Sequence, residues 1–139
     1  MQIVQTSITG ENINHSNAIG YSYIILASTG GHTEIVDFLI MNGANVNKKT
    51  IVGNTSIYIA SENGHLETVK VLLCGGSNYY CKANNNITPI MVAYKCGHNK
   101  ISKVLENWPL TMLIIVLQEL VVYHLLDFSS FIEFIQYFS

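Results

Sequence analysis

The chain repeats itself every 33 residues, and this period constrains its fold more than any other feature. Residues 22–32, 55–65 and 88–98 each read as a capped turn, a short helix and a glycine stop. The same residue types recur in register: a hydroxyl residue first, an alanine in the middle and a Gly-His pair at the end. A fixed period of roughly 20 to 50 residues is typical of a repeat array, in which no unit buries its apolar face alone. We therefore expect stacked units that share one continuous core.

Each unit predicts two helices joined by a tight turn. A loop that needs a positive φ comes first, a side chain then caps the first helix, and a left-handed glycine ends it. The loop positions are Gly20, Gly53 and Asn86, the caps are Ser22, Thr55 and Thr88, and the stops are Gly31, Gly64 and Gly97. A second helix follows at helical spacing, with Val69, Leu72 and Leu73 as its apolar side in the second unit.

The repeated motif resembles the ankyrin-repeat family. The third unit opens with Thr88-Pro89, the second turns at Gly64-His65, and the first closes on Gly43-Ala44-Asn45-Val46-Asn47, all close to the family pattern. The resemblance implies an all-α solenoid of stacked helix-turn-helix units with loop or β-hairpin tips. It covers residues 18–107, as units at about 18–49, 50–82 and 83–107. Residues 1–17 read as a partial, degenerate repeat.

Histidine positions show one departure from the family pattern. The residues that stand where the family has a histidine in the first helix are Ile25, Tyr58 and Met91. We therefore expect a looser stack than in a regular array. The turn histidines His32, His65 and His98 recur with the period and could be mistaken for metal ligands. Because the family uses this histidine to brace the loop, the resemblance implies a structural role.

The end of the chain follows a different pattern. Asn107-Trp108-Pro109 offers a helix start, and the apolar run of residues 110–126 contains no helix breaker. Ser129-Ser130 interrupts the run, and residues 130–133 fit a capping box that opens a second helix. The pattern therefore predicts a hydrophobic two-helix segment at residues 108–139.

Three uses of this segment stay open. It could cap the open end of the stack in place of a fourth repeat, which we favour. It could instead bind a partner or a second copy of the chain, or touch a membrane through residues 110–126. A span of that length is at the lower limit for a bilayer, and Gln118, Glu119 and His124 lie inside it. No lysine follows Lys103 that could anchor the helix on the far side of a bilayer. The short length, the polar residues and the missing lysine all argue against a span.

The composition argues against several functions. Seven lysines, no arginine and a formal net charge of −2 do not suit phosphate backbones, so we expect no nucleic-acid partner. Cys74, Cys81 and Cys96 form no CxxC pair, and residues 1–10 show no secretory signal. We expect free thiols and an intracellular, cytoplasmic location. The sequence shows no phosphate loop, nucleophile elbow or metal-ligand set, so we expect no enzyme activity, metal or cofactor.

The function implied by the resemblance is protein recognition. Partners of ankyrin proteins lie against the concave side that the loop tips and first helices form. Carried onto this chain, the candidate partner-binding residues are Tyr21, Thr29, Ile51, Val52, Asn54, Glu62, Asn63, Asn84, Asn85, Ile87 and Lys95. Ile51, Val52 and Ile87 are apolar at positions where solvent does not favour them. We therefore expect a non-catalytic scaffold or adaptor.

Other interpretations stay open beside this one. The tail could tether an ankyrin protein to a membrane. It could also act as a helical box that recruits a ubiquitin ligase. Trp108-Pro109-Leu110 bears a faint likeness to such a box. The chain could be a fragment of a longer array. Finally, Asn47 directly follows Val46 and stands eight residues after Leu39, a spacing at which ankyrin-like repeats resemble substrates of asparaginyl hydroxylases.

Overall fold

The computed structural model describes residues 12–122 and 128–138. Its helices are α2 (Tyr23–Thr29), α3 (Thr33–Met41), α4 (Ser56–Asn63), α5 (Leu66–Cys74), α6 (Pro89–Lys95), α7 (Asn99–Val122) and α8 (Phe128–Phe138). No β-strand occurs in the described ranges, and the predicted all-α solenoid is confirmed. The chain divides into two compact units, which we name the repeat array (residues 1–105) and the tail (residues 106–139).

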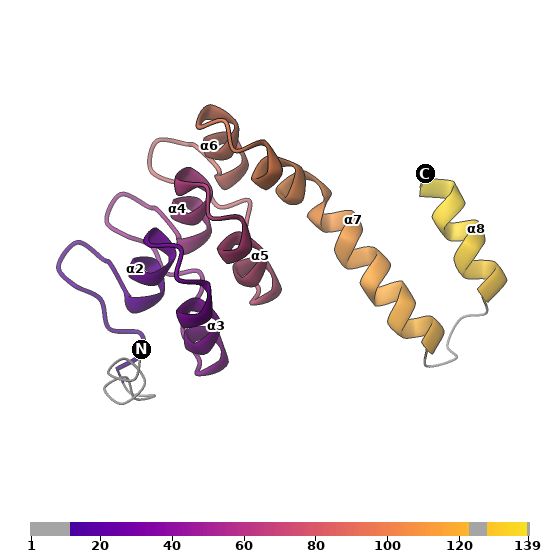
Figure 1. Cartoon of the computed structure of the whole chain (residues 1–139), viewed down its shortest axis with the longest axis horizontal. Helices are drawn as coiled ribbons and strands as arrows, with labels where there is room; N and C mark the ends of the chain where they lie inside the picture. The colour runs from indigo at the N-terminus through magenta and orange to yellow at the C-terminus, as the bar shows by residue number, and fades with distance from the viewer. Residues whose placement is uncertain (1–11, 123–127, 139) are drawn as a thin grey trace. The chain divides into compact units, whose positions relative to one another are not determined.

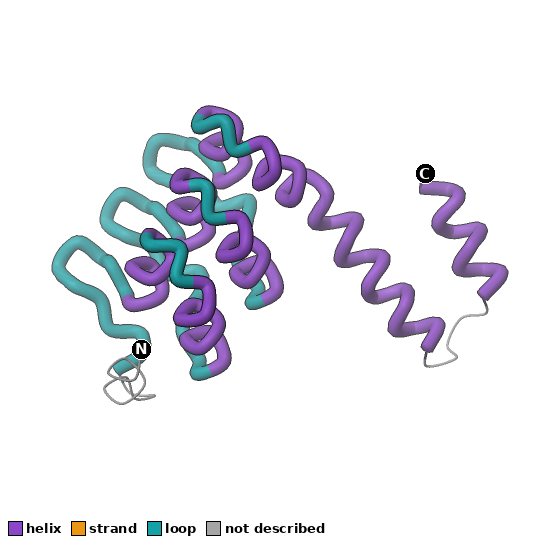
Figure 2. Tube along the Cα trace, viewed as in Figure 1, coloured by secondary structure: helices purple, strands orange, loops and turns teal. Residues whose placement is uncertain are grey.

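The repeat array stacks its helices in two rows (Figure 1). The first helices α2, α4 and α6 pack side by side, and the second helices α3 and α5 pack on each other. Within a unit, α2 packs on α3 and α4 packs on α5. A loop precedes every first helix and extends to the same side of the array (Figure 2). The units therefore present their loops on one common face.

The first helix of each unit begins where predicted. Ser22, Thr55 and Thr88 are the N-cap residues, each with extended backbone. The Thr55 hydroxyl accepts a hydrogen bond from the Tyr58 N–H at 3.3 Å, and the Thr88 hydroxyl accepts one from the Met91 N–H at 3.4 Å. The predicted cap bond is wrong for Ser22, whose hydroxyl is buried without a hydrogen-bond partner. Serine lacks the second Cβ substituent that restricts the threonine rotamer, so its hydroxyl is not held toward the helix end.

Left-handed residues close the turns at the predicted positions. The φ angles are 68° at Gly31, 79° at Gly64 and 77° at Gly97, and 83°, 80° and 63° at the loop positions Gly20, Gly53 and Asn86. Gly64 meets a second requirement as well. An added Cβ there would lie 2.6 Å from Cε1 of His98, which belongs to the next unit. Backbone conformation and packing between units therefore both require glycine at this position.

All three units share the core of the array. Both helices of a unit contribute buried aliphatic side chains, among them Ile24, Ile25, Val36, Leu39, Ile57, Val69, Leu72, Val92, Ile101 and Leu105. Burial of one such side chain stabilises the fold by roughly 1.5–3 kcal/mol. Because these side chains are covered by neighbouring units as well as by their own, the units depend on one another for stability.

Two of the turn histidines, His65 and His98, connect their units to the preceding unit. His65 Nε2 lies 3.0 Å from the carbonyl oxygen of Thr29, and His98 Nε2 lies 3.0 Å from that of Glu62. Because a carbonyl oxygen only accepts, the imidazole N–H is the donor. The structural role predicted for His65 and His98 is therefore confirmed. Each closes the end of the previous first helix, while the looser stack expected from the missing first-helix histidine stays a prediction.

Two asparagines make a second set of links between units. The Asn14 side chain accepts from the Asn45 N–H at 2.7 Å, and the Asn47 side chain accepts from the Asn78 N–H at 2.7 Å. Both amides also donate to a glycine carbonyl of the following turn. The position 33 residues after Asn47 is Tyr80, which has no such amide. The asparagine link is therefore made by Asn14 and Asn47 and is not repeated at the third equivalent position.

α7 is longer than predicted because the third unit lacks the usual stop. α3 and α5 are each followed by a left-handed glycine, Gly43 with a φ of 89° and Gly76 with a φ of 87°. The position 33 residues after Gly76 is Pro109. Proline is held at a φ of about −65° and cannot form this turn. The helix that begins at Asn99 thus continues to Val122 with Pro109 inside it, and the predicted helix start at residues 107–109 is wrong.

The second helix of the tail is present, but it begins before its predicted capping box. Ser129 and Ser130, read as an interruption and a cap, both lie inside α8. The apolar spacing starts at Phe128, one turn before Phe131, and this longer amphipathic pattern outweighs the local cap preference. Residues 123–127, where the first tail helix was predicted to end, lie outside the described residues. The role of the tail as a cap stays a prediction.

Candidate protein-binding surface

Three hairpin loops of the same geometry form the edge of the candidate surface. In each loop a backbone N–H donates to the carbonyl four residues on. These bonds join Asn17 to Tyr21 at 3.1 Å, Thr50 to Asn54 at 3.0 Å, and Ala83 to Ile87 at 3.0 Å. We name the face made by residues 17–21, 50–54 and 83–87, together with the first helices, the tip face.

Neighbouring loops are joined to one another at their tips. The Ile51 N–H donates to the Ile19 carbonyl at 3.2 Å, and the Asn84 N–H donates to the Val52 carbonyl at 3.0 Å. The Asn84 side chain adds a bond from its amide to the Ile51 carbonyl at 3.0 Å. The tips therefore form a continuous hydrogen-bonded row, and their side chains are presented from a fixed backbone.

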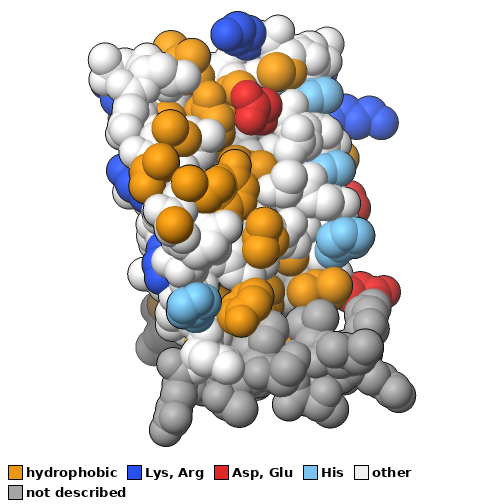
Figure 3. All heavy atoms as spheres, turned by 90° about the vertical axis from the view of Figure 1, so that its left-hand side faces the viewer, with side chains coloured by type: hydrophobic (Ala, Val, Ile, Leu, Met, Phe, Trp, Pro, Cys, Tyr) orange, Lys and Arg blue, Asp and Glu red, His pale blue; other side chains and the backbone are white. Residues whose placement is uncertain are grey.

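The middle of this row is apolar and exposed. Ile51 is 66% exposed and Val52 is 51% exposed, as is Ile19 on the preceding loop. Hydrophobic side chains gather in a band over this side of the array (Figure 3). Because water does not favour such groups on a rigid surface, the band is a candidate contact site for another protein.

Several of the predicted polar residues make hydrogen bonds within the array, one of them between units. The Asn63 side chain donates to the Thr29 carbonyl at 3.4 Å, and the Asn85 side chain accepts from the Ile87 N–H at 3.1 Å. The Thr29 hydroxyl donates to the Ile25 carbonyl at 2.9 Å within α2. Among the other predicted residues, Glu62 and Lys95 are exposed, and Tyr21, Asn54 and Ile87 are half-buried.

The structure also exposes apolar residues that the prediction omitted. These are Ile19, Leu26, Met91 and Tyr94. Met91 and Tyr94 lie on α6 and are half exposed, whereas the residues at the same repeat position in the other units, Ile25, Tyr58, Ser28 and Ser61, are buried. The sequence contains a signal for the exposure of Tyr94, because the other two units have a small serine at the same position of the 33-residue repeat.

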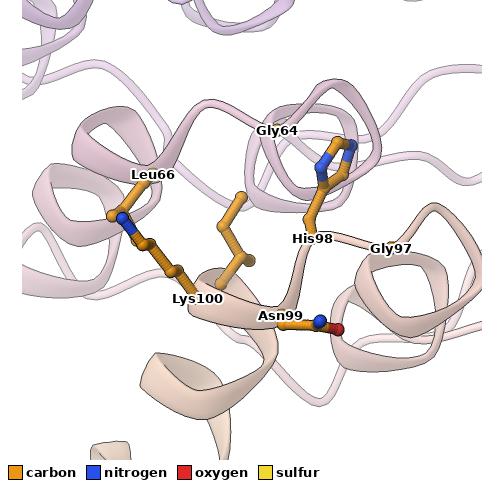
Figure 4. Close-up of a pocket in the computed structure, with 7 residues that line it drawn as sticks. Gly64, Leu66, Gly97, His98, Asn99 and Lys100 are labelled. Carbon is orange, nitrogen blue, oxygen red and sulfur yellow. The ribbon is translucent and has the colours of Figure 1, made fainter.

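An open pocket of about 310 Å³ lies between the second and third units (Figure 4). Gly64, Leu66 and residues 97–101 line it. The His98 ring beside it already donates to the Glu62 carbonyl. Within residues 12–122 and 128–138, no group of three or more His, Cys, Asp or Glu side chains could hold a metal ion. Of these residue types, the pocket lining contains only His98.

Tyr79 and Tyr80 form a pair in the loop after α5. Their ring centroids are 4.1 Å apart, and the Tyr79 hydroxyl donates to the Tyr80 hydroxyl at 2.9 Å. Burial, together with this hydrogen bond, raises the pKa of Tyr79 to about 12. The nearby Cys81 is a free thiol, as are Cys74 and Cys96.

Comparison with known proteins agrees with this architecture. The family model described as ankyrin repeats (3 copies) matches residues 1–83, which is more than half of the chain. No curated protein matches the chain. Ankyrin repeats generally mediate protein–protein interactions, and the family is typically non-catalytic. The match begins at residue 1, so it includes the residues read as a partial repeat. It ends before α6, although α6 repeats the cap and turn of the earlier units. This chain therefore belongs to the ankyrin-repeat family.

Proposed function

We propose that the chain is a non-catalytic scaffold that holds a partner protein against the tip face. The observation that carries the proposal is the exposed apolar pair Ile51 and Val52 on a loop whose backbone is bonded to both neighbouring tips. Binding to a rigid surface costs less conformational entropy than binding to a mobile loop. The apolar tips supply the buried contact, and Glu62, Asn63 and Lys95 supply polar contacts around it.

The same proposal places the protein inside the cell, most simply in the cytoplasm. Cys74 and Cys96 are exposed and Cys81 is half-buried, and all three are free thiols. Exposed thiols persist in a reducing compartment. The proposal includes no cofactor, because a binding scaffold of this kind needs none.

Site-specific photocrosslinking tests the proposal. A photoreactive residue at Ile51 should capture a defined partner in cells, and Val52→Glu in the same chain should abolish the product. Met41 provides the control, because it is 79% exposed but lies at the end of a second helix. Equal capture from Ile51 and Met41, or capture that Val52→Glu leaves unchanged, would remove the tip face as the binding site.

A further inference from the structure

The tail part of α7 carries many exposed apolar side chains. Ten of the thirteen residues 110–122 are apolar. Six of these have exposed fractions between 36% and 68%, namely Leu110, Met112, Leu113, Ile115, Val116 and Val122. Only Ile101, Ser102 and Leu105, near the start of the helix, are buried. The later turns therefore need an apolar surrounding that is not supplied by the described residues.

The exposed apolar residues of α7 are spread over about two thirds of the helix circumference. Successive residues of an α-helix are about 100° apart, so positions 110, 112, 113, 115 and 116 do not form one stripe. α5 shows the contrast, because it buries Val69 and Leu72 and exposes Glu67 and Lys70. A helix that is apolar over most of its circumference is typical of a large core or of a membrane.

α7 is the one helix in the described residues that is long and apolar enough to cross a membrane. Two other kinds of helix have the same composition, and neither applies. A core helix of a soluble protein is mostly buried, whereas only 11% of the apolar window of α7 is buried. A signal sequence precedes the folded domain, whereas the apolar part of α7 comes after the repeat units.

We propose that residues 108–122 of α7 insert into the hydrocarbon interior of a lipid bilayer. Lys100 and Lys103 are the last two lysines of the sequence, and they precede the apolar segment, so positive charge lies on its array side. Trp108 stands where the apolar run begins, and an indole favours the membrane–water interface. The Thr111 hydroxyl donates to the Asn107 carbonyl at 3.0 Å, so it needs no water partner.

Length and charge limit how deep this segment goes. Fifteen residues of helix measure about 22 Å, against about 30 Å for the hydrocarbon core. The proposal is therefore insertion, not a complete crossing by these residues. Glu119 is the one charged residue in positions 107–122, and a carboxylate opposes entry into hydrocarbon. Glu119→Leu should strengthen membrane binding.

Trp108 allows a direct test because it is the only tryptophan of the chain. The full chain is mixed with phosphatidylcholine vesicles, and its fluorescence and its flotation with the vesicles are measured. Insertion predicts a shift of the emission to shorter wavelength, quenching by brominated acyl chains, and flotation. A chain that stays in the aqueous fraction, with unshifted emission, overturns the proposal.

Matched variants distinguish insertion of α7 from lipid binding by another surface and from self-association. Ile115→Lys with Val116→Lys should weaken vesicle partitioning at least about tenfold, whereas Glu119→Leu should raise it. The unfolding transition of the array should not change, because both positions are exposed in the tail. Flotation that the double-lysine variant retains would show that another surface binds lipid. The other outcome is a chain that does not float but forms an oligomer without lipid. If the double-lysine variant dissociates that oligomer, the helix binds a second copy of the chain. Either outcome overturns the proposal.

Discussion

Gly64→Ala should destabilise the repeat array more than Gly97→Ala does. Both glycines are left-handed, with φ angles of 79° and 77°, so alanine costs roughly 1–2 kcal/mol of backbone strain at either position. An added Cβ at Gly97 meets no atom within 4 Å, whereas at Gly64 it would lie 2.6 Å from the His98 ring. The ring must move and weaken its 3.0 Å bond to the Glu62 carbonyl, which adds about 1 kcal/mol. We expect totals of about 1–2 kcal/mol for Gly97→Ala and about 2–3 kcal/mol for Gly64→Ala.

Urea unfolding followed by circular dichroism measures these free energies. The decisive comparison repeats both substitutions in a His98→Ala background. Without the ring, Gly64→Ala should cost no more than Gly97→Ala, because only the backbone term is left. If the two glycine substitutions cost the same free energy when His98 is present, the prediction is wrong. The contact between an added Cβ at position 64 and the His98 ring would then have no effect on stability.

Three further predictions follow from single contacts. Asn47→Ala should lower the free energy of unfolding by about 1–2 kcal/mol, because it removes two bonds between units; an unchanged urea midpoint would contradict this link. Ser28→Ala should be neutral or stabilising, because the Ser28 hydroxyl is buried without a partner, whereas Ser61→Ala should destabilise, because the Ser61 hydroxyl donates to a carbonyl at 2.6 Å. The reverse order in thermal melting would contradict this. Tyr80→Phe should lower the pKa of Tyr79 from about 12, as read by ultraviolet titration of the phenols. Because this pKa is raised in the folded state, its contribution to stability is present below the unfolded pKa and is lost as pH rises toward 12; an unchanged titration would show that the hydrogen bond has no part in the shift.

The period and local chemistry were sufficient to predict the elements of the array. Caps at Thr55 and Thr88 and left-handed turns at Gly64 and Gly97 depend on residues within one helical turn, so their effects are local. The prediction failed where a local preference competed with a longer pattern. Ser130 fits a cap, but the apolar spacing from Phe128 includes it in α8.

The candidate surface was less predictable than the helices. Exposure of Ile51 and Val52 follows from their loop positions, and the prediction included both. The double use of Asn63 and Asn84 does not follow, because their partners lie 34 and 33 residues away in the sequence. Amides of this kind look like free surface groups until the units are stacked.

The sequence contains the repeat period, the turn positions and the family pattern, since steric limits on φ and helix capping act between near neighbours. Stacking determines which side chains link the units, as His98 and Asn47 do, and which are left exposed, as Met91 and Tyr94 are. The length of α7 and the exposure of its side chains depend on local sequence and on packing, respectively. Pro109 removes the left-handed stop by local sterics, while the extent of apolar surface left open on the helix depends on which neighbours cover it. Burial is a property of the packed chain, and no window of sequence contains it.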